Sequence, residues 1–373
     1  DIIMNYILDI SCLDELSSGA KQRFLNLYSA LISTNKNKKF VVIYTTFTEV
    51  KKILNFPNVS FVKNNFNQDT YLNKMISIIF IFFYIKIKFK KIKTIEYFTL
   101  PFFKIKKTKT IFTIHDVRRI FFAKNFFSQL FFKFFFKFFL NQTTNIIVVS
   151  KAIKNEIKKH FHKLKIIVIY NVIDKKFFQN IAKKNIHIIK RKYDLPNKFI
   201  LTVGHQEKRK NFLRLIKAID ILKKDGHNIK LVIIGQKADE TKKINRLIIK
   251  LNLSQNIKIF PNLNNFEVRC FYRLAGLFVF PSVYEGFGVP LLEAMASNLP
   301  MALSNTEVFR EITQNRYSYF DQYDSLSIAN RIKFVLSNKS LQKRMITYGK
   351  KRVVNFSANV QAKQINNLYN NKI

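Results

Sequence analysis

Short apolar runs alternate with longer amphipathic stretches along most of the chain. Each short run rich in Val, Ile and Phe predicts a buried β-strand, and apolar residues at every third or fourth position predict a helix. The predicted strands are Asn5–Ile10, Lys39–Thr46, Val59–Lys63, Thr94–Phe98, Thr110–Ile114, Asn145–Ser150, Lys165–Tyr170, Phe199–Val203, Lys230–Ile234, Ile257–Phe260, Leu277–Phe280 and Pro300–Ser304. The clearest helices are Lys21–Ile32, Asn211–Lys224, Glu240–Leu251, Ser325–Leu336 and Leu341–Val354. Alternating strands and helices predict an α/β fold with parallel sheets and right-handed crossovers.

The alternation is interrupted once, by the polar and basic segment Asp174–Lys198, which predicts a linker that can hold a short helix. A chain of 373 residues that is 48% apolar can form two hydrophobic cores. We therefore expect two Rossmann-like, doubly wound domains that face a cleft, over residues 1–180 and 181–355. The remaining residues, 356–373, predict a C-terminal helix that packs back on the first domain.

Two very apolar stretches need a separate interpretation. Met75–Ile85 is too short to span a bilayer and is followed by lysines, so we interpret it as a buried helix or strand. Asn125–Asn141 predicts a helix with one narrow polar stripe, because its polar residues recur at every fourth position. A helix this apolar either packs in a core or lies against a membrane, and the pattern leaves both open.

The formal net charge of +42 favours an anionic partner: nucleic acid, a membrane surface or an anionic substrate. The abundance of Lys, Asn, Ile and Phe is also typical of AT-rich codon usage, which accounts for part of this charge. We interpret the charge as support for attraction to anionic lipid. Only Cys12 and Cys270 are present, so a disulfide framework is excluded and a reducing compartment is favoured.

The strongest chemical signal is the stretch Val279–Pro300, which reads VFPSVYEGFGVPLLEAMASNLP. A predicted strand is followed by a loop with Gly286 and Gly288, and Pro290 then stands where a helix would begin. A helix that starts after a glycine loop presents backbone N–H groups to an anion. Glu285 and Glu293 place two hydrogen-bond acceptors beside this cradle, a combination that suits a sugar joined to a nucleotide through a diphosphate.

This stretch resembles the signature of the retaining glycosyltransferases of family 4, which have the GT-B fold. The resemblance implies that Glu285 binds hydroxyls of the donor sugar and that Glu293 binds the ribose. It implies further donor contacts, several of them through the backbone, from the residues of the loop and the helix start, Gly286, Phe287, Gly288, Val289 and Leu292.

A second basic segment follows the predicted strand that ends at Gly204. Its residues Lys208, Arg209 and Lys210 precede a predicted helix, so they would add cations to a helix N-terminus. The segment resembles a family string whose lysine contacts the donor diphosphate, and Lys210 matches that lysine. Gly204 and Arg209 are also expected to bind the donor. The family often has an arginine directly after the glycine, but His205 stands there, which leaves Arg209 or Lys208 as the second cation.

Two positions in the N-terminal half also resemble family segments. Gly19 matches the glycine loop that approaches the transferred sugar, although only one glycine of the usual pair is present. His115, directly after a predicted strand, matches a histidine near the donor sugar and the acceptor. A structural role remains the alternative for this histidine. Ser150 is expected to cap a helix.

The resemblance implies transfer of a sugar from a GDP- or UDP-linked donor with retention of configuration, without a metal or another cofactor. His115, Glu285 and Lys210 are the predicted catalytic residues. The expected acceptor is a glycolipid or a polysaccharide under assembly, and the expected location is the cytoplasm, at the inner face of the membrane. A basic nucleic-acid-binding protein and a sugar-nucleotide epimerase of the same fold are the alternatives; the lysines are spread along the whole chain, which speaks against the first.

Overall fold

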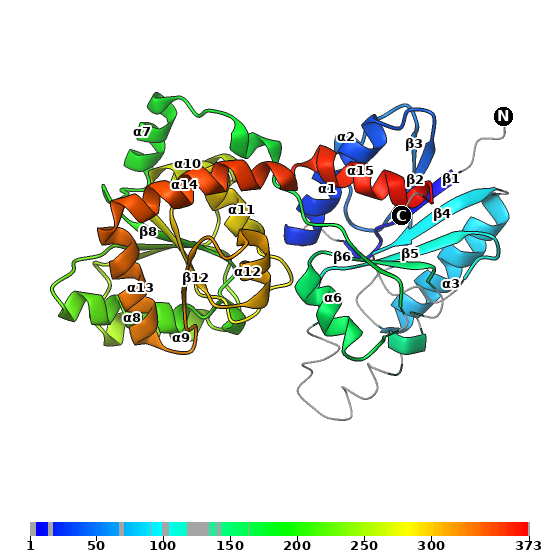
Figure 1. Ribbon diagram of the computed structural model, residues 1–373. Helices are drawn as coiled ribbons and strands as arrows, with labels where there is room; N and C mark the ends of the chain where they lie inside the picture. The colour runs from blue at the N-terminus through cyan, green and yellow to red at the C-terminus, as the bar shows by residue number, and fades with distance from the viewer. Residues whose placement is uncertain are drawn as a thin grey trace. The chain divides into compact units, whose positions relative to one another are not determined.

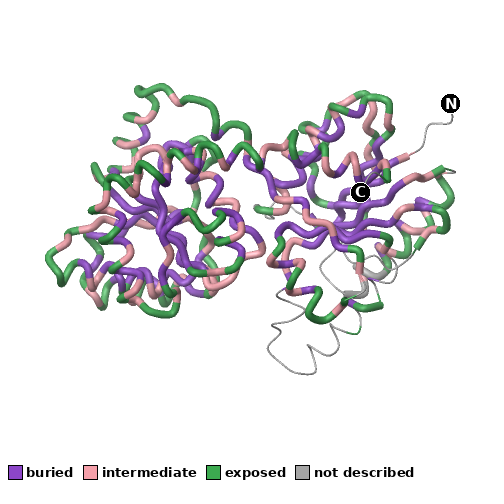
Figure 2. Tube along the Cα trace, in the orientation of Figure 1, coloured by how far each residue is buried: buried purple, intermediate pink, exposed green. Residues whose placement is uncertain are grey.

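The computed structural model describes residues 5–13, 18–66, 71–89, 91–98, 104–117, 134, 136–138, 140, 143–162 and 164–371. The chain divides into two units. The N-terminal unit comprises residues 1–174 and 357–373, and the C-terminal unit comprises residues 175–356. Both units hold a parallel sheet whose central strands are buried, as Figure 2 shows. The predicted α/β architecture with doubly wound sheets is therefore confirmed.

The sheet of the N-terminal unit has seven parallel strands in the order β3-β2-β1-β4-β5-β6-β7 (Figure 1). The strands are β1 (Asn5–Asp9), β2 (Lys39–Tyr44), β3 (Val59–Lys63), β4 (Ile92–Tyr97), β5 (Lys109–Ile114), β6 (Asn145–Val148) and β7 (Ile166–Val168). The described helices are α1 (Ser18–Ser33), α2 (Val50–Ile53), α3 (Tyr71–Lys88), α6 (Lys151–Lys158) and α15 (Ala358–Tyr369). As expected, Ser150 caps α6, because its hydroxyl accepts a hydrogen bond from the Ile153 N–H.

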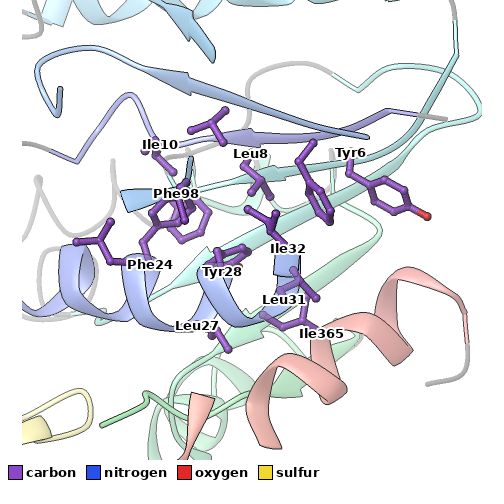
Figure 3. Packing of buried hydrophobic residues seen from close by; sticks show 14 of the residues in the cluster. Tyr6, Leu8, Ile10, Phe24, Leu27, Tyr28, Leu31, Ile32, Phe98 and Ile365 are labelled. Atoms are coloured by element: carbon purple, nitrogen blue, oxygen red, sulfur yellow. The ribbon is translucent and has the colours of Figure 1, made fainter. Parts of the chain in front are cut away.

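Successive residues of β1 point to opposite faces of this sheet and so join two separate cores. Leu8 packs into the larger core, where Phe24 of α1 and Ile365 of α15 lie (Figure 3). Ile7 points the other way and packs with Ile81 of α3. The C-terminal helix α15 is thus an integral part of the N-terminal unit, because its residues Ala362, Ile365, Leu368 and Tyr369 share this core with α1.

A buried carboxylate ties three elements of the N-terminal unit together. Glu96, at the end of β4, is fully buried. Its Oε1 accepts hydrogen bonds from the hydroxyls of Tyr28 in α1 and Thr113 in β5, and its Oε2 accepts one from Tyr369 in α15, 2.6 Å away. Three hydroxyl donors replace the water that this carboxylate loses on burial, which is the condition for a charge to be tolerated in a core.

The sheet of the C-terminal unit has six parallel strands in the order β10-β9-β8-β11-β12-β13. The strands are β8 (Ile200–Val203), β9 (Leu231–Ile234), β10 (Ile257–Phe260), β11 (Leu277–Phe280), β12 (Met301–Ser304) and β13 (Ser318–Phe320). The α-helices are α7 (Lys183–Lys192), α8 (Phe212–Lys224), α9 (Thr241–Lys250), α10 (Asn265–Leu274), α11 (Val289–Ala296), α12 (Glu307–Thr313), α13 (Ser325–Ser337) and α14 (Lys339–Val353), with short 3-10 turns at Lys175–Phe178, Lys208–Lys210 and Val354–Phe356. The strand order reverses between β8 and β11, and ligands of open α/β sheets bind beyond the carboxyl ends of strands at such a point.

Three stretches are compared with the expectation. The segment Asp174–Lys198 was predicted as a linker that can hold a short helix. It contains helix α7, whose Ile189 is buried, and from Lys175 onward it is part of the C-terminal unit. Met75–Ile85 lies in α3, as one of the two alternatives predicted, but several of its apolar side chains are exposed. The stripe predicted over Asn125–Asn141 falls largely outside the described residues. Within the part that is described, no helix is long and apolar enough to cross a membrane.

The buried carboxylate network predicts the effect of a conservative change. Tyr369→Phe keeps the ring in the core but removes one donor to Glu96, so we expect the free energy of unfolding to fall by about 2 kcal/mol, the typical cost of a lost bond to a charged group. Tyr323→Phe is the matched control, because Tyr323 is 62% exposed. Urea denaturation of both variants measures the difference; equal stabilities would contradict the account.

Candidate functional site

The site is built where β8 and β11 end side by side at the reversal of strand order. The strand β11 leads through the glycine loop into α11, and Gly288 is the N-cap of that helix with a φ of +99°. A side chain there would be strained, and its Cβ would come within 3.0 Å of the Phe309 ring and 3.2 Å of the Phe280 ring. Glycine thus lets the loop lie on two aromatic rings and start a helix at the edge of the sheet.

The segment after β8 contacts this loop directly. The Val283 N–H donates to the carbonyl oxygen of Arg209 at 2.9 Å, and the Asn211 side-chain amide donates to the carbonyl oxygen of Pro281 at 3.0 Å. Asn211 has a left-handed backbone conformation between the turn Lys208–Lys210 and helix α8. These bonds fix the basic segment against the end of β11.

The two predicted sequence motifs meet in one ion cluster. The Oε1 atom of Glu285 accepts hydrogen bonds from Lys210 Nζ at 2.7 Å and from Arg209 Nη1 at 2.8 Å. Arg209 also pairs with Glu207 through its Nε, at 2.6 Å. Glu285 and Lys210 side chains are nearly buried, whereas Arg209 is partly open to solvent. Residues far apart in the sequence therefore form one charged site with two cations around a single central carboxylate.

Burial and pairing act on these charges in opposite directions. Burial alone would raise the pKa of Glu285, but Lys210 and Arg209 outweigh it and hold the pKa below its ordinary value. Burial lowers the pKa of Lys210, and the Glu285 carboxylate opposes that shift. The Lys210 ammonium also lies 5.3 Å from the centroid of the Phe280 ring, close enough for a cation–π interaction. The pairing therefore favours the ionised form of Glu285 and opposes the effect of burial on Lys210.

Two glycines make room for Lys210 at the strand ends. A Cβ on Gly204 would come within 2.9 Å of Cδ and Cε of Lys210, so this glycine gives the lysine its path to Glu285. A Cβ on Gly235, at the end of β9, would lie 1.8 Å from the carbonyl oxygen of Gly204. Gly204 was predicted as a site residue and lies beside Lys210 in the structure. Gly235 has no side chain that would collide with the Gly204 backbone.

Glu293 lies one turn into α11 and contacts Tyr272 of α10. Tyr272 is buried, and its hydroxyl lies 3.4 Å from the carbonyl oxygen of Pro290. Burial first, and then the Glu293 carboxylate with which it shares a hydrogen bond, raise the pKa of Tyr272 well above its ordinary value. A neutral tyrosine hydroxyl therefore fixes the carboxylate that the sequence motif singles out.

The remaining candidates of the C-terminal unit lie in the glycine loop and in α11, and two of them are buried. Phe287 is buried against Phe356, with ring centroids 5.9 Å apart, and Leu292 is fully buried. Their side chains belong to the core of the C-terminal unit. Gly286 lies in the loop before α11, and Val289 is the first residue of that helix. Over the described ranges, no group of three His, Cys, Asp or Glu residues could hold a metal ion.

The two N-terminal candidates lie in the other unit. The prediction that Gly19 lies in a loop is wrong: it is the second residue of α1, it is exposed, and a Cβ would meet no atom within 4 Å. His115 directly follows β5, and its Nε2 is buried and has no hydrogen-bond partner among the described residues. Burial, together with the charge of Arg23, lowers the pKa of His115 to about 3, so the ring is neutral.

Sequence reasoning missed Phe280, Tyr272 and Gly235. Phe280 is the last residue of one predicted strand and Gly235 directly follows another, but neither position in the sequence shows which other segment the residue contacts. Tyr272 lies in α10, a helix that the apolar pattern did not predict. A signal for α10 was present, because Asn264 and Glu267 form a capping box at its start.

Comparison with known sequences decides the family. The profile described as Glycosyl transferases group 1 matches residues 183–352, and the profile described as Glycosyltransferase Family 4 matches residues 93–177. The chain belongs to glycosyltransferase family 4. The first profile contains the whole ion cluster, and the second contains His115, whereas Gly19 lies outside both matched ranges.

Individual relatives agree with this assignment. The chain is 29% identical over 252 residues to the O-antigen chain mannosyltransferase RfbU of Salmonella typhimurium, a match that covers 67% of this chain and 66% of RfbU. Among solved structures, a glycosyltransferase from Rickettsia africae has a TM-score of 0.76 at 18% identity and covers 100% of this chain and 99% of its own. Anabaena HepE in complex with UDP-glucose has a TM-score of 0.74 at 15% identity, with 99% and 100% covered. These structures establish that the chain has the GT-B fold.

The ion cluster predicts a defined pH dependence. Because the pKa of folded Glu285 lies below its ordinary value of 4.5, the pairing stabilises the fold above pH 4.5 and is lost as the pH falls through the lowered pKa. Glu285→Gln imitates the protonated form. We expect it to cost about 3–5 kcal/mol of unfolding free energy near neutral pH, the usual effect of breaking a buried ion pair.

Measuring the unfolding free energies of the wild-type protein and Glu285→Gln at acidic pH tests whether Glu285 is ionised. The stability difference between the wild-type protein and Glu285→Gln should shrink as the pH falls below 4.5. Asp225→Asn, at an exposed residue directly after α8, is the control and should show no such convergence. Chemical denaturation over this pH range measures it, and a difference that stays constant would show that the carboxylate is not the ionised partner.

Proposed function

We propose that the chain is a retaining glycosyltransferase that transfers mannose or glucose from a nucleoside diphosphate donor to a glycolipid or polysaccharide. The observation that carries this proposal is the cluster of Lys210, Arg209 and Glu285 at the ends of β8 and β11. Two cations, one largely buried and one partly open to solvent, suit a diphosphate, and the neighbouring start of α11 adds the positive end of a helix dipole.

In the proposed reaction, the bond between the sugar C1 and the diphosphate oxygen breaks, and its electron pair stays on the diphosphate. The acceptor hydroxyl attacks C1 from the same face, and its proton passes to the departing phosphate oxygen. Lys210 and Arg209 stabilise the charge that develops on the leaving group. Because these cations are already in place, the site needs little reorganisation as the charge forms.

The two glutamates have separate tasks in this proposal. Glu285, at the centre of the cluster, accepts hydrogen bonds from sugar hydroxyls when the diphosphate takes over part of its pairing with the cations. Glu293, oriented by Tyr272, accepts hydrogen bonds from the ribose. His115 is neutral, so it offers one N–H and one acceptor nitrogen for orienting a sugar or acceptor hydroxyl.

The relatives support two different donors, one that carries mannose and one that carries glucose. RfbU is by its name a mannosyltransferase, whereas HepE binds UDP-glucose in its solved structure. RfbU is the relative with the higher identity, and we therefore propose GDP-mannose as the donor. The assignment of the C-terminal unit to the donor and of the N-terminal unit to the acceptor is part of the same proposal.

The acceptor is proposed to be lipid-linked and to lie at the cytoplasmic face of a membrane. RfbU is named for the O-antigen chain. The formal net charge of +42 fits an enzyme that works beside anionic lipid.

Separate glutamate variants test this division of tasks. We expect Glu293→Ala to weaken donor binding by roughly tenfold or more, the effect of a lost hydrogen bond to a charged group. We expect Glu285→Ala to lower turnover more than binding, by about a hundredfold, because its contacts serve the transition state. Calorimetry with GDP-mannose measures binding, and release of GDP to water measures turnover while the acceptor is unidentified.

Asp225→Ala is the matched control for both variants, since it removes an exposed carboxylate from the same unit at the opposite edge of the sheet. All proteins are compared at a temperature at which circular dichroism shows them folded. If both glutamate variants bind and turn over the donor as the control does, the proposed site is wrong.

A further inference from the structure

Helix α3 exposes an apolar face that the proposed reaction does not use. Five large apolar side chains on this helix are substantially open to solvent: Ile76, Ile79, Phe80, Phe83 and Ile87. Phe83 is 53% exposed and Ile87 is 79% exposed. Their spacing of three or four residues places them along one side of the helix.

The exposed side lies opposite the side that packs on the sheet. Ile81 and Ile85 are buried in the core that contains Ile7 of β1 and Ile95 of β4, and Ser77 is buried one turn earlier. At 100° per residue, Phe83 and Ile76 point away from this buried strip. The helix is therefore apolar on both sides, a pattern that in a soluble fold is normally covered.

Lysines surround the C-terminal end of this helix. Lys86 and Lys88 are exposed in its last turn, and Lys91, Lys104, Lys106 and Lys107 are exposed nearby. The last four lie just before β4 and β5, which begin at the same edge of the parallel sheet, and Phe89, Ile92 and Ile105 of these segments pack on one core. The one acidic residue between Tyr71 and Lys109 is Glu96, which is fully buried.

The lysine stems and the aromatic rings of α3 share this surface. Lys86 Nζ lies 5.9 Å from the ring centroid of Phe82, and Lys88 Nζ lies 5.2 Å from that of Tyr84. Long lysine side chains can lie along apolar surface and keep their charge in water. Such a surface is complementary to a bilayer: the apolar helix face can enter the acyl chains, and the lysines at its border can contact the anionic headgroups.

We propose that the outer face of α3, defined by Ile76, Ile79, Phe80, Phe83 and Ile87, docks on an anionic phospholipid membrane, with the lysines at its C-terminal end on the headgroups. A second copy of the chain is disfavoured as the occupant, because face-to-face pairing would bring two lysine groups together. The inference deepens the proposed function, on whose lipid-linked acceptor it rests, by naming the surface that brings the enzyme to its acceptor.

Co-sedimentation of the full chain with vesicles tests this surface. The vesicles contain phosphatidylglycerol and phosphatidylcholine, or phosphatidylcholine alone. We expect the double variant Phe83→Gln with Ile87→Gln to lower the partition onto anionic vesicles by roughly tenfold or more, because two exposed apolar groups no longer enter the bilayer. Lys86→Gln with Lys88→Gln should weaken binding and reduce its dependence on salt.

The matched control is Phe334→Gln with Ile249→Gln, which changes the same residue types at exposed positions of the C-terminal unit, 47% and 69% exposed. This control should bind vesicles as the wild-type protein does. Equal binding by all variants would show diffuse charge attraction and overturn the proposal, as would a shift from dimer to monomer in the α3 variant with unchanged vesicle binding. Donor binding is measured separately by calorimetry, so a failed membrane test and a failed donor site are distinguishable.

Discussion

The pairing of Glu285 with Lys210 and Arg209 is the interaction on which the functional part of this structure depends. A lysine with so little contact with water is stable in its charged form only beside a carboxylate, and the carboxylate is stable only beside the cations. The pair also joins the segment after β8 to the loop after β11. The same ion pairs therefore balance the buried charges and fix the positions of the two loops. A diphosphate ligand would enter a site whose cations are already positioned.

The fold supplies this constraint through its strand order. The strand order in the sheet of the C-terminal unit reverses between β8 and β11, and ligands of open α/β sheets bind beyond the carboxyl ends of strands at such a point. Glycines then allow close approach where side chains would collide: Gly204 beside Lys210, and Gly288 on the rings of Phe280 and Phe309. The N-terminal unit repeats the architecture but ties its last helix to the sheet through Glu96.

Much of this could be predicted because the signals are local. Strand and helix alternation identified the α/β class, and the positions of Gly286, Gly288 and Pro290 predicted the loop that leads into α11. What the sequence could not show is how separate segments meet. The contact of Lys210 with Glu285 depends on β8 and β11 being neighbours, and the role of Tyr272 depends on its hydroxyl reaching the start of α11. Short elements such as β13 and α12 carry too few residues for a period to be visible. The prediction that Met75–Ile85 is buried was only partly right. Apolar composition predicts burial, but it does not show which side of a helix packs on other elements and which side is exposed.

The central claim is that the cluster at the ends of β8 and β11 binds a nucleoside diphosphate. A thermal-shift measurement of the wild-type protein with GDP, UDP, ADP and their common sugar conjugates, without added metal, tests it most directly. A ligand that binds only the folded state raises the melting temperature, and saturation at about a hundred times Kd corresponds to roughly 2.7 kcal/mol. The account predicts a selective rise with GDP and GDP-mannose that is lost in Lys210→Met. No rise with any nucleotide, in a sample shown to be folded, would contradict it.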